Sequence, residues 1–230
     1  MTVKMPPQTL ERGDLFKLGV GATAGVLSTA SAETYPEFRR RLRESDCQRC
    51  ALAAGRRHIV VDRGNPDAAI IGISDAPSFV EDAQGIPFCG RAGQKLDELF
   101  AAEGLSTDKH LLLVNVVKCH PPYNRPPHPD EMARCEPFLE RQLAFSPARF
   151  VVLLGIFALR RFAPERRPFS AHVGQFFRLP QWPGREVLPL HHPALLLRNP
   201  SLEPLMRKHI RELAARVCEA TSKTGPLGDR

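Results

Sequence analysis

Cysteine spacing gives the first indication of chemistry in this sequence. Cys47 and Cys50 form a C-x-x-C pair, and fifteen residues separate Cys119 from Cys135. Brought together, these thiolates could hold a structural zinc ion or an iron-sulfur cluster, and the ligand types alone do not separate the two. Buried thiols or disulfides without a metal are the alternative. A thioredoxin-like redox pair is disfavoured, because the C-x-x-C precedes the first expected strand.

The segment from residue 74 to 93 is a second candidate site, and it reads S-D-A-P-S-F-V-E-D-A-Q-G-I-P-F-C-G-R-A-G. It directly follows an apolar run and gathers Asp75, Glu81 and Asp82 in a chain that is otherwise basic. Its prolines and glycines are typical of a loop and not of a packed core. We therefore expect either an exposed connection or a functional site.

Apolar runs alternate with helical patterns over most of the chain. The runs rich in Val, Ile and Leu cover 58–61, 68–73, 111–117, 149–155 and 186–190. The helical patterns cover 92–104, 129–145, 155–162 and 201–217. Strands that are apolar on both faces and separated by helices indicate a mainly parallel sheet covered on both sides. The expected fold class is α/β, a three-layer α/β/α sandwich with a central, mainly parallel sheet.

The expected sheet indicates where a ligand would bind. In open α/β sheets, ligands bind beyond the carboxyl ends of the strands. The loops that follow Ile73, Val117, Leu154 and Leu190 are therefore the candidate positions. The segment 74–93 is the first of these loops, so its acidic residues belong to the expected site.

The charge of the chain favours an anionic partner. The formal net charge is +7 and the sequence pI is about 9.4, which suits nucleic acid among other anions. Several arginines occur in groups, and the guanidinium fork matches the oxygens of a phosphate. These groups are Arg39, Arg40, Arg41 and Arg43, then Arg56 with Arg57, Arg160 with Arg161, and Arg166 with Arg167. An ordinary basic surface is the alternative.

We expect one domain over residues 34–220, preceded by an extension, residues 1–33, and followed by a flexible tail, residues 221–230. Residues 10–32 resemble a twin-arginine export leader in which Gly13 replaces the second arginine. An export signal that lacks one of its two arginines is usually not recognised by its receptor, so we expect a cytoplasmic protein. No stretch reaches the roughly 18 apolar residues that span a bilayer, which indicates no membrane partner.

Three motifs in the candidate loops resemble those of a known family. The iron-sulfur uracil-DNA glycosylases, or family 4, carry G-E-A-P-G-x-x-E-D-x-x-G-x-P-F-V-G-x-A-G, which aligns without gaps on residues 74–93. Their second motif, N-x-V-K-C-R-P-P-x-N-R-x-P, aligns on 115–127 with His120 in the first arginine position. Their third, H-P-A-x-L-L-R, aligns on 192–198.

The resemblance implies a DNA-repair enzyme with a bound cofactor. Such a monofunctional glycosylase hydrolyses the N-glycosidic bond of uracil in DNA and leaves an abasic site, and we expect it to act as a monomer on DNA that contains uracil. The cysteine positions of the family imply a 4Fe-4S cluster, favoured over zinc, with the ligands Cys47, Cys50, Cys119 and Cys135. The cluster is expected to be structural.

Two residues are implied to carry the chemistry once uracil has left the duplex and entered a pocket. His192 would donate a hydrogen bond to uracil O2, where negative charge develops as the bond breaks. Asp75 occupies the glutamate position of the family, where it would position water and oppose the positive charge on the sugar. Glu81 and Asp82 match the E-D pair of the family, and we expect them to order the loop, the alternative being a role in catalysis.

Four further residues are implied to bind the substrate, namely Ala76, Phe88, Asn115 and Arg198. The Phe88 ring would stack on uracil, the alternative being a core phenylalanine at a loop end. Asn115 would accept a hydrogen bond from N3–H and donate one to O4, the alternative being an amide that caps the loop. Arg198, with leucines 195–197, would press into the minor groove, the alternative being a buried leucine run.

The first motif departs from the family where catalysis is expected, because S-D-A-P-S at 74–78 replaces G-E-A-P-G. The shorter Asp75 side chain places its carboxylate about 1.5 Å short of a glutamate position, and displacements of this order can cost ~100-fold in rate. A serine in place of glycine is also strained wherever φ is positive. Two alternatives stay open. One is a degenerate member that binds uracil-containing or single-stranded DNA with weak or altered excision, and the other, suggested by residues 10–32, is an exported iron-sulfur or redox protein.

Overall fold

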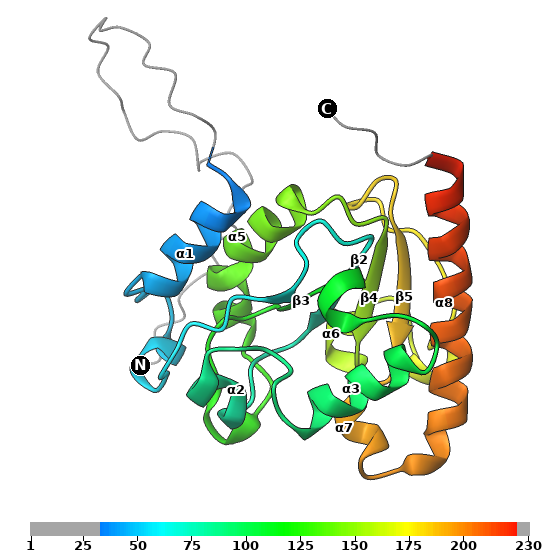
Figure 1. Ribbon diagram of the computed structural model, residues 1–230. Coiled ribbons are helices and arrows are strands. Elements are labelled where there is room, and N and C mark those ends of the chain that lie inside the picture. Colours follow the sequence, from blue (N-terminus) through cyan, green and yellow to red (C-terminus); the bar gives the residue numbers. More distant parts are fainter. Residues whose placement is uncertain (1–32, 225–230) are drawn as a thin grey trace, which may run out of the picture. The chain divides into compact units, whose positions relative to one another are not determined.

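A sheet of five strands runs through the centre of the computed structural model, which describes residues 33–224 (Figure 1). Its strands are β1 (Arg63–Gly64), β2 (Ile70–Ser74), β3 (Leu111–Asn115), β4 (Phe150–Leu154) and β5 (Glu186–Leu190). Their order across the sheet is β1-β3-β2-β4-β5. β1 is antiparallel to β3, whereas the other neighbours pair in parallel. The predicted α/β class with a mainly parallel sheet is confirmed.

Helices precede, connect and follow these strands. The α-helices among the described residues are α1 (Tyr35–Glu44), α2 (Phe79–Gln84), α3 (Arg91–Ala101), α4 (Thr107–His110), α5 (Pro129–Phe145), α6 (Ile156–Phe162), α7 (Pro193–Leu196) and α8 (Glu203–Thr224). Short 3-10 helices are η1 (Ala51–Ala54), η2 (Pro122–Asn124), η3 (Phe169–Ala171) and η4 (Pro200–Leu202). None of the helices in this part of the chain is long and apolar enough to cross a membrane.

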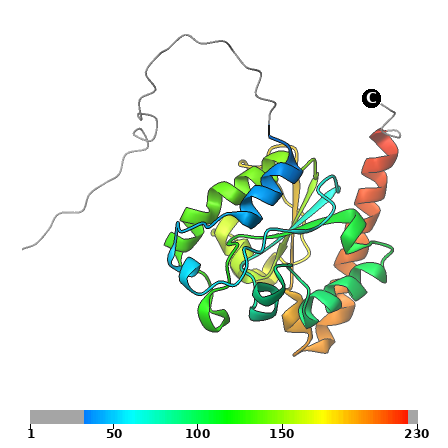
Figure 2. The same ribbon diagram turned by 60° about the vertical axis from the view of Figure 1, so that its left-hand side comes forward.

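The helices cover both faces of the sheet, which gives the predicted three layers (Figures 1 and 2). On one face α1, α5 and α6 pack through side chains such as Leu139 and Leu159. On the other face α3, α7 and α8 pack through side chains such as Leu99 and Ile210. In β2, β3, β4 and β5, alternate apolar residues join one cluster or the other, because successive side chains of a strand point to opposite faces.

The first expected strand, at 58–61, is wrong. Val60 and Val61 are buried as the apolar run suggested, but the backbone there forms no strand, and the Val60 amide donates a 2.8 Å hydrogen bond to the Lys118 carbonyl. That carbonyl lies beyond the end of β3, where no ladder continues. The strand that pairs with β3 is instead the two-residue β1 at Arg63–Gly64.

The described part begins at Glu33 and ends at Thr224, the last residue of α8. The leader-like residues 10–32 and residues 225–230 lie outside it, so the proposed extension and tail stay predictions. α8 continues a few residues past position 220, where the domain was expected to end.

Candidate active site

The carboxyl ends of the parallel strands bring the predicted site residues to one edge of the sheet. Asp75 directly follows β2, Asn115 is the last residue of β3, and His192 lies two residues after β5. The register pairs Ser74 with Asn115, so the first two motifs leave the sheet side by side. The backbone continues this pairing, because the Val117 amide donates to the Asp75 carbonyl at 3.1 Å.

Asp75 is half-buried at the edge of the sheet. Desolvation by burial raises the pKa of its carboxyl to about 7, although a hydrogen bond from the Ala158 backbone opposes this shift. The Ala158 amide belongs to α6, the helix that follows β4. A carboxyl group with this pKa exchanges a proton near neutral pH, as a general base must.

His192 is neutral in this environment. Burial, helped by the positive charge of Arg198, lowers the pKa of its imidazole to about 4. The backbone amide of Ala194 donates to Nδ1 at 3.2 Å, so the neutral ring carries its proton on Nε2. Gly155 lets the histidine approach, because a Cβ at this residue would lie 3.2 Å from the His192 Cβ and its φ of +102° disfavours any other residue. The ring is therefore a fixed donor through Nε2.

Asn115 presents a buried donor without a partner. The residue is 1% exposed, and its Nδ2 makes no hydrogen bond to any of the described residues. Its backbone carbonyl accepts a hydrogen bond from the Lys118 ammonium, which also donates to the Gln142 side chain. Leaving a buried amide donor unsatisfied is costly, so such a group is a candidate for ligand binding.

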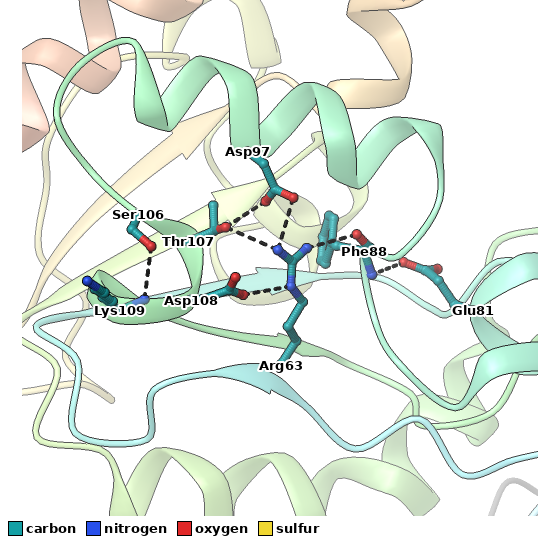
Figure 3. A network of polar contacts seen from close by, with 8 residues as sticks. All are labelled: Arg63, Glu81, Phe88, Asp97, Ser106, Thr107, Asp108 and Lys109. Atoms are coloured by element: carbon teal, nitrogen blue, oxygen red, sulfur yellow. Dashed lines mark hydrogen bonds and ion pairs between the residues drawn. The ribbon is translucent and has the colours of Figure 1, made fainter.

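Phe88 is fixed through its backbone (Figure 3). It has a φ of 55°, and its amide donates to the Glu81 carboxylate while its carbonyl accepts from the Arg63 guanidinium at 3.0 Å. A Cβ on Gly93 would fall 1.6 Å from this carbonyl oxygen, so glycine is required there. Phe88 is 3% exposed, and its side chain packs in the core cluster of α3, α7 and α8. Its ring centroid lies 6.2 Å from that of His192.

The loop at 74–93 is ordered by its own acidic pair. Glu81 accepts from the Ser78 amide at 2.6 Å as well as from Phe88, and Asp82 accepts from the Arg57 amide at 3.0 Å. These are the contacts expected of loop-ordering residues. The strain of a serine at positive φ does not arise here, because Ser78 has a φ of −79° and caps α2, and Ser74 is part of β2.

The third motif forms α7 and the turn after it. Leu196 is buried in the core, whereas Leu195 and Leu197 are partly exposed and Arg198 is exposed. Leu196 thus fits the alternative of a buried run, whereas Leu195 and Leu197 are accessible, as a wedge requires. Ala76 is half-buried and packs against the core cluster of α1, α5 and α6.

All four predicted cluster ligands line one cavity, together with Arg56 and Lys118. These ligands are Cys47, Cys50, Cys119 and Cys135. None of them forms a disulfide. Burial raises the pKa of Cys119 to about 12 and raises that of Cys135. Within the described residues, no three ligating side chains converge closely enough to hold one metal ion.

Comparison with known proteins identifies the family. A model of the uracil DNA glycosylase superfamily matches residues 61–216, about two thirds of the chain. The chain belongs to this superfamily. The type-4 uracil-DNA glycosylase of Thermotoga maritima is 37% identical over 161 residues, which cover 70% of this chain and 83% of the relative. Those of Sulfurisphaera tokodaii and Archaeoglobus fulgidus are 36% and 35% identical and cover 73% and 68% of this chain, and 80% of each relative. The resemblance to the type-4 enzymes is confirmed.

Three residues of this glycosylase site were missed from the sequence. Gly155 was detectable, because a glycine between an apolar run and a helix is a tight strand-to-helix turn. Lys118 lies within the second motif, but nothing in the sequence indicates its full burial. Arg63 had no local signal, because its partners Asp97 and Asp108, each 2.9 Å away, come from other elements of the chain.

Replacing Arg63 by alanine is expected to loosen the loop of Phe88. The substitution removes hydrogen bonds to two carboxylates and to the Phe88 carbonyl, and should lower the free energy of unfolding by about 1–3 kcal/mol. Urea denaturation of the purified protein measures this. Arg207→Ala is the matched control, because Arg207 is more exposed and its partner Glu103 keeps Arg211; its effect should stay within about 1 kcal/mol. Equal stability of Arg63→Ala and the wild type would contradict the positioning role.

Proposed function

We propose that this protein is a uracil-DNA glycosylase that hydrolyses the N-glycosidic bond of uracil in DNA and leaves an abasic site. The observation that carries the proposal is the buried, unpartnered Nδ2 of Asn115 at the edge of the sheet that also carries Asp75 and His192. Membership of the superfamily and three relatives named as type-4 uracil-DNA glycosylases support it.

Asn115 would read the base. Its Nδ2 donates to uracil O4 and its Oδ1 accepts from N3–H, whereas cytosine carries an amino donor where Nδ2 needs an acceptor. Leaving the Asn115 donor unpaired is costly, so cytosine is rejected. We assign the stacking contact to Phe88 because its ring lies beside His192 and its backbone is held at both ends. Ala76 and Arg198 would contact the nucleotide from the first and third motifs.

His192 and Asp75 would share the chemistry. Water attacks the anomeric carbon, the bond from that carbon to uracil N1 breaks, and uracil leaves with its electron pair. The Nε2–H of His192 stabilises the negative charge at O2. The Asp75 carboxylate orients the water, accepts its proton and opposes the positive charge on the sugar.

Strand scission of a uracil-containing oligonucleotide by hot alkali, after incubation with the protein, tests this function. The wild type should produce scission on single-stranded DNA and on DNA with uracil opposite G. His192→Ala should lower the rate by ~10²–10³-fold, because it removes an oxyanion donor, and Asp75→Ala should lower it as well. Salt-dependent DNA binding without abasic product would support the alternative of a degenerate binder.

The pH profile separates the two groups. Asp75 must be ionised, and its pKa is raised to about 7, so kcat/KM should rise about tenfold per pH unit below 7 and level off above it. The pKa of His192 is lowered to about 4, so this residue stays neutral and adds no pH dependence to kcat/KM between pH 5 and 9. Asp75→Asn should abolish the rise of kcat/KM below pH 7, along with most of the activity. A wild-type profile that is flat from pH 5 to 9 would contradict the assignment of Asp75.

We further propose that Cys47, Cys50, Cys119 and Cys135 hold a 4Fe-4S cluster. The donor set fits, because the four thiols line one cavity and none is tied up in a disulfide. A cubane takes one thiolate on each iron, so its ligands need not converge on one point as the ligands of a single zinc ion do. When bound, the cluster would cross-link the C-x-x-C segment to the segment after β3, which holds Cys119, and to α5, which holds Cys135. The Arg56 and Lys118 cations, which line the cavity, offset the negative charge of the thiolates.

Metal content tests this assignment without reference to activity. Protein purified anaerobically should contain about four iron atoms per chain by elemental analysis. Cys135→Ser should lose most of this iron and unfold at a lower temperature. Cys89→Ser and Cys218→Ser are the controls and should keep it, because neither residue lines the cavity. One zinc ion per chain in place of iron would contradict the cluster.

We also propose a cytoplasmic monomer that acts on DNA containing uracil. The cysteines of the described part are all free thiols, which suits a reducing compartment. The basic net charge of +7 suits DNA as the partner.

A further inference from the structure

Large apolar side chains are exposed around the edge of the sheet where the proposed site lies. They project from segments that follow strands, on α2, the loop after it, η2, α6 and α7. These residues are Phe79, Val80, Ile86, Tyr123, Phe157, Leu195 and Leu197. Tyr123 is 99% exposed and Phe79 is 55% exposed, which sets these two aromatic rings apart from the buried phenylalanines of the core. The family motifs leave both positions unspecified.

Tyr123 is held in the solvent by its backbone. Its φ is 57° and that of Asn124 is 53°, a left-handed conformation that tyrosine rarely adopts. The turn is closed by hydrogen bonds from the Asn124 amide to the Pro121 carbonyl and from the Arg125 amide to the Pro122 carbonyl. The side chain is 99% exposed, so packing against the described residues does not explain this turn. Strained, exposed aromatic residues of this kind occur at ligand-binding positions.

Asn124 joins Tyr123 to Phe79. Its Oδ1 accepts from the Phe79 amide at 3.2 Å and lies 3.0 Å from the His120 Nε2. The Phe79 ring meets the His120 ring edge-on at 6.2 Å, and the Arg57 guanidinium lies 5.2 Å from the Phe79 ring centroid. α2 and the loop after β3 consequently lie next to each other beyond the carboxyl ends of the strands (Figures 1 and 2).

We propose that Phe79 and Tyr123 form a stacking platform for unpaired bases next to the target uracil, so that single-stranded DNA is the preferred substrate. Phe79 begins α2 and Tyr123 lies in η2, and these two helices follow β2 and β3, the strands after which the proposed site lies. Unpaired bases present π faces that stack on aromatic side chains, whereas a duplex buries those faces between base pairs. The Arg57 cation beside Phe79 suits the adjoining phosphate. This inference rests on the proposed function and specifies its substrate.

Kinetics on a single-stranded oligonucleotide with one uracil between two purines test the platform. Tyr123→Ala should raise KM about tenfold and leave kcat unchanged, because the stacking energy of one base is lost before the chemical step. Tyr123→Phe keeps the ring and should restore the wild-type KM. Tyr123→Asn lacks the ring but tolerates the left-handed turn, so it should behave as Tyr123→Ala. This variant separates loss of stacking from a change in the loop.

The complementary experiment changes the DNA instead of the protein. An oligonucleotide in which abasic spacers flank the uracil should raise the KM of the wild type, and Tyr123→Ala should then have little further effect. With a fully paired duplex, the difference between the wild type and Tyr123→Ala should shrink in the same way. Both results would show that the tyrosine acts through a neighbouring unpaired base.

The proposal is overturned if the wild type excises uracil but Tyr123→Ala and Tyr123→Asn keep its KM within twofold, or if Tyr123→Phe fails to restore it. A wild type that excises no uracil would instead reject the proposed function. The platform is then judged by fluorescence anisotropy with the same oligonucleotides. Weaker binding of Tyr123→Ala and Tyr123→Asn, restored in Tyr123→Phe, supports it, and equal binding overturns it.

Discussion

Burial of the parallel strands on both faces is the constraint on which this structure depends. Every residue of β2, β3 and β4 is buried, so these strands leave little room for reactive side chains within the sheet. The polar groups of the site appear where the strands end, at Asp75 and Asn115, and just beyond β5 at His192. Parallel pairing collects those ends at one edge, which turns three motifs far apart in the sequence into one site.

The same burial sets the charges of the site. Desolvation disfavours the charged form of each group, which raises the pKa of Asp75 and lowers that of His192. The carboxyl group becomes a base near neutral pH, and the imidazole becomes a neutral donor that Ala194 fixes in one tautomer. Two opposite shifts with one cause thus suit the two groups to different parts of one reaction. The polar contacts of Arg63 and Glu81 hold the Phe88 backbone beside them.

Lys118 connects the cysteine cavity to the edge of the sheet at which Asn115 lies. It lines the cavity, is 1% exposed, and donates to the Asn115 carbonyl, so one buried ammonium contacts both places. Burial lowers its pKa to about 8, and the neighbouring Cys135, Asp62 and Cys119 oppose that shift. Through this contact, the segment that would hold the cluster also supports the strand end that presents Asn115.

The sequence by itself determined the fold class, four of the five strands, the family and the four cavity cysteines, because these depend on local composition and on spacing. It could not place β1, since the apolar run at 58–61 is buried without a ladder, and it gave no sign that Asp97 and Asp108 would meet Arg63. Nor could it show that Tyr123 is exposed, or in which direction the pKa of Asp75 shifts. Only the tertiary structure decided these features, because exposure, desolvation and ion pairing depend on neighbours that come from distant parts of the chain.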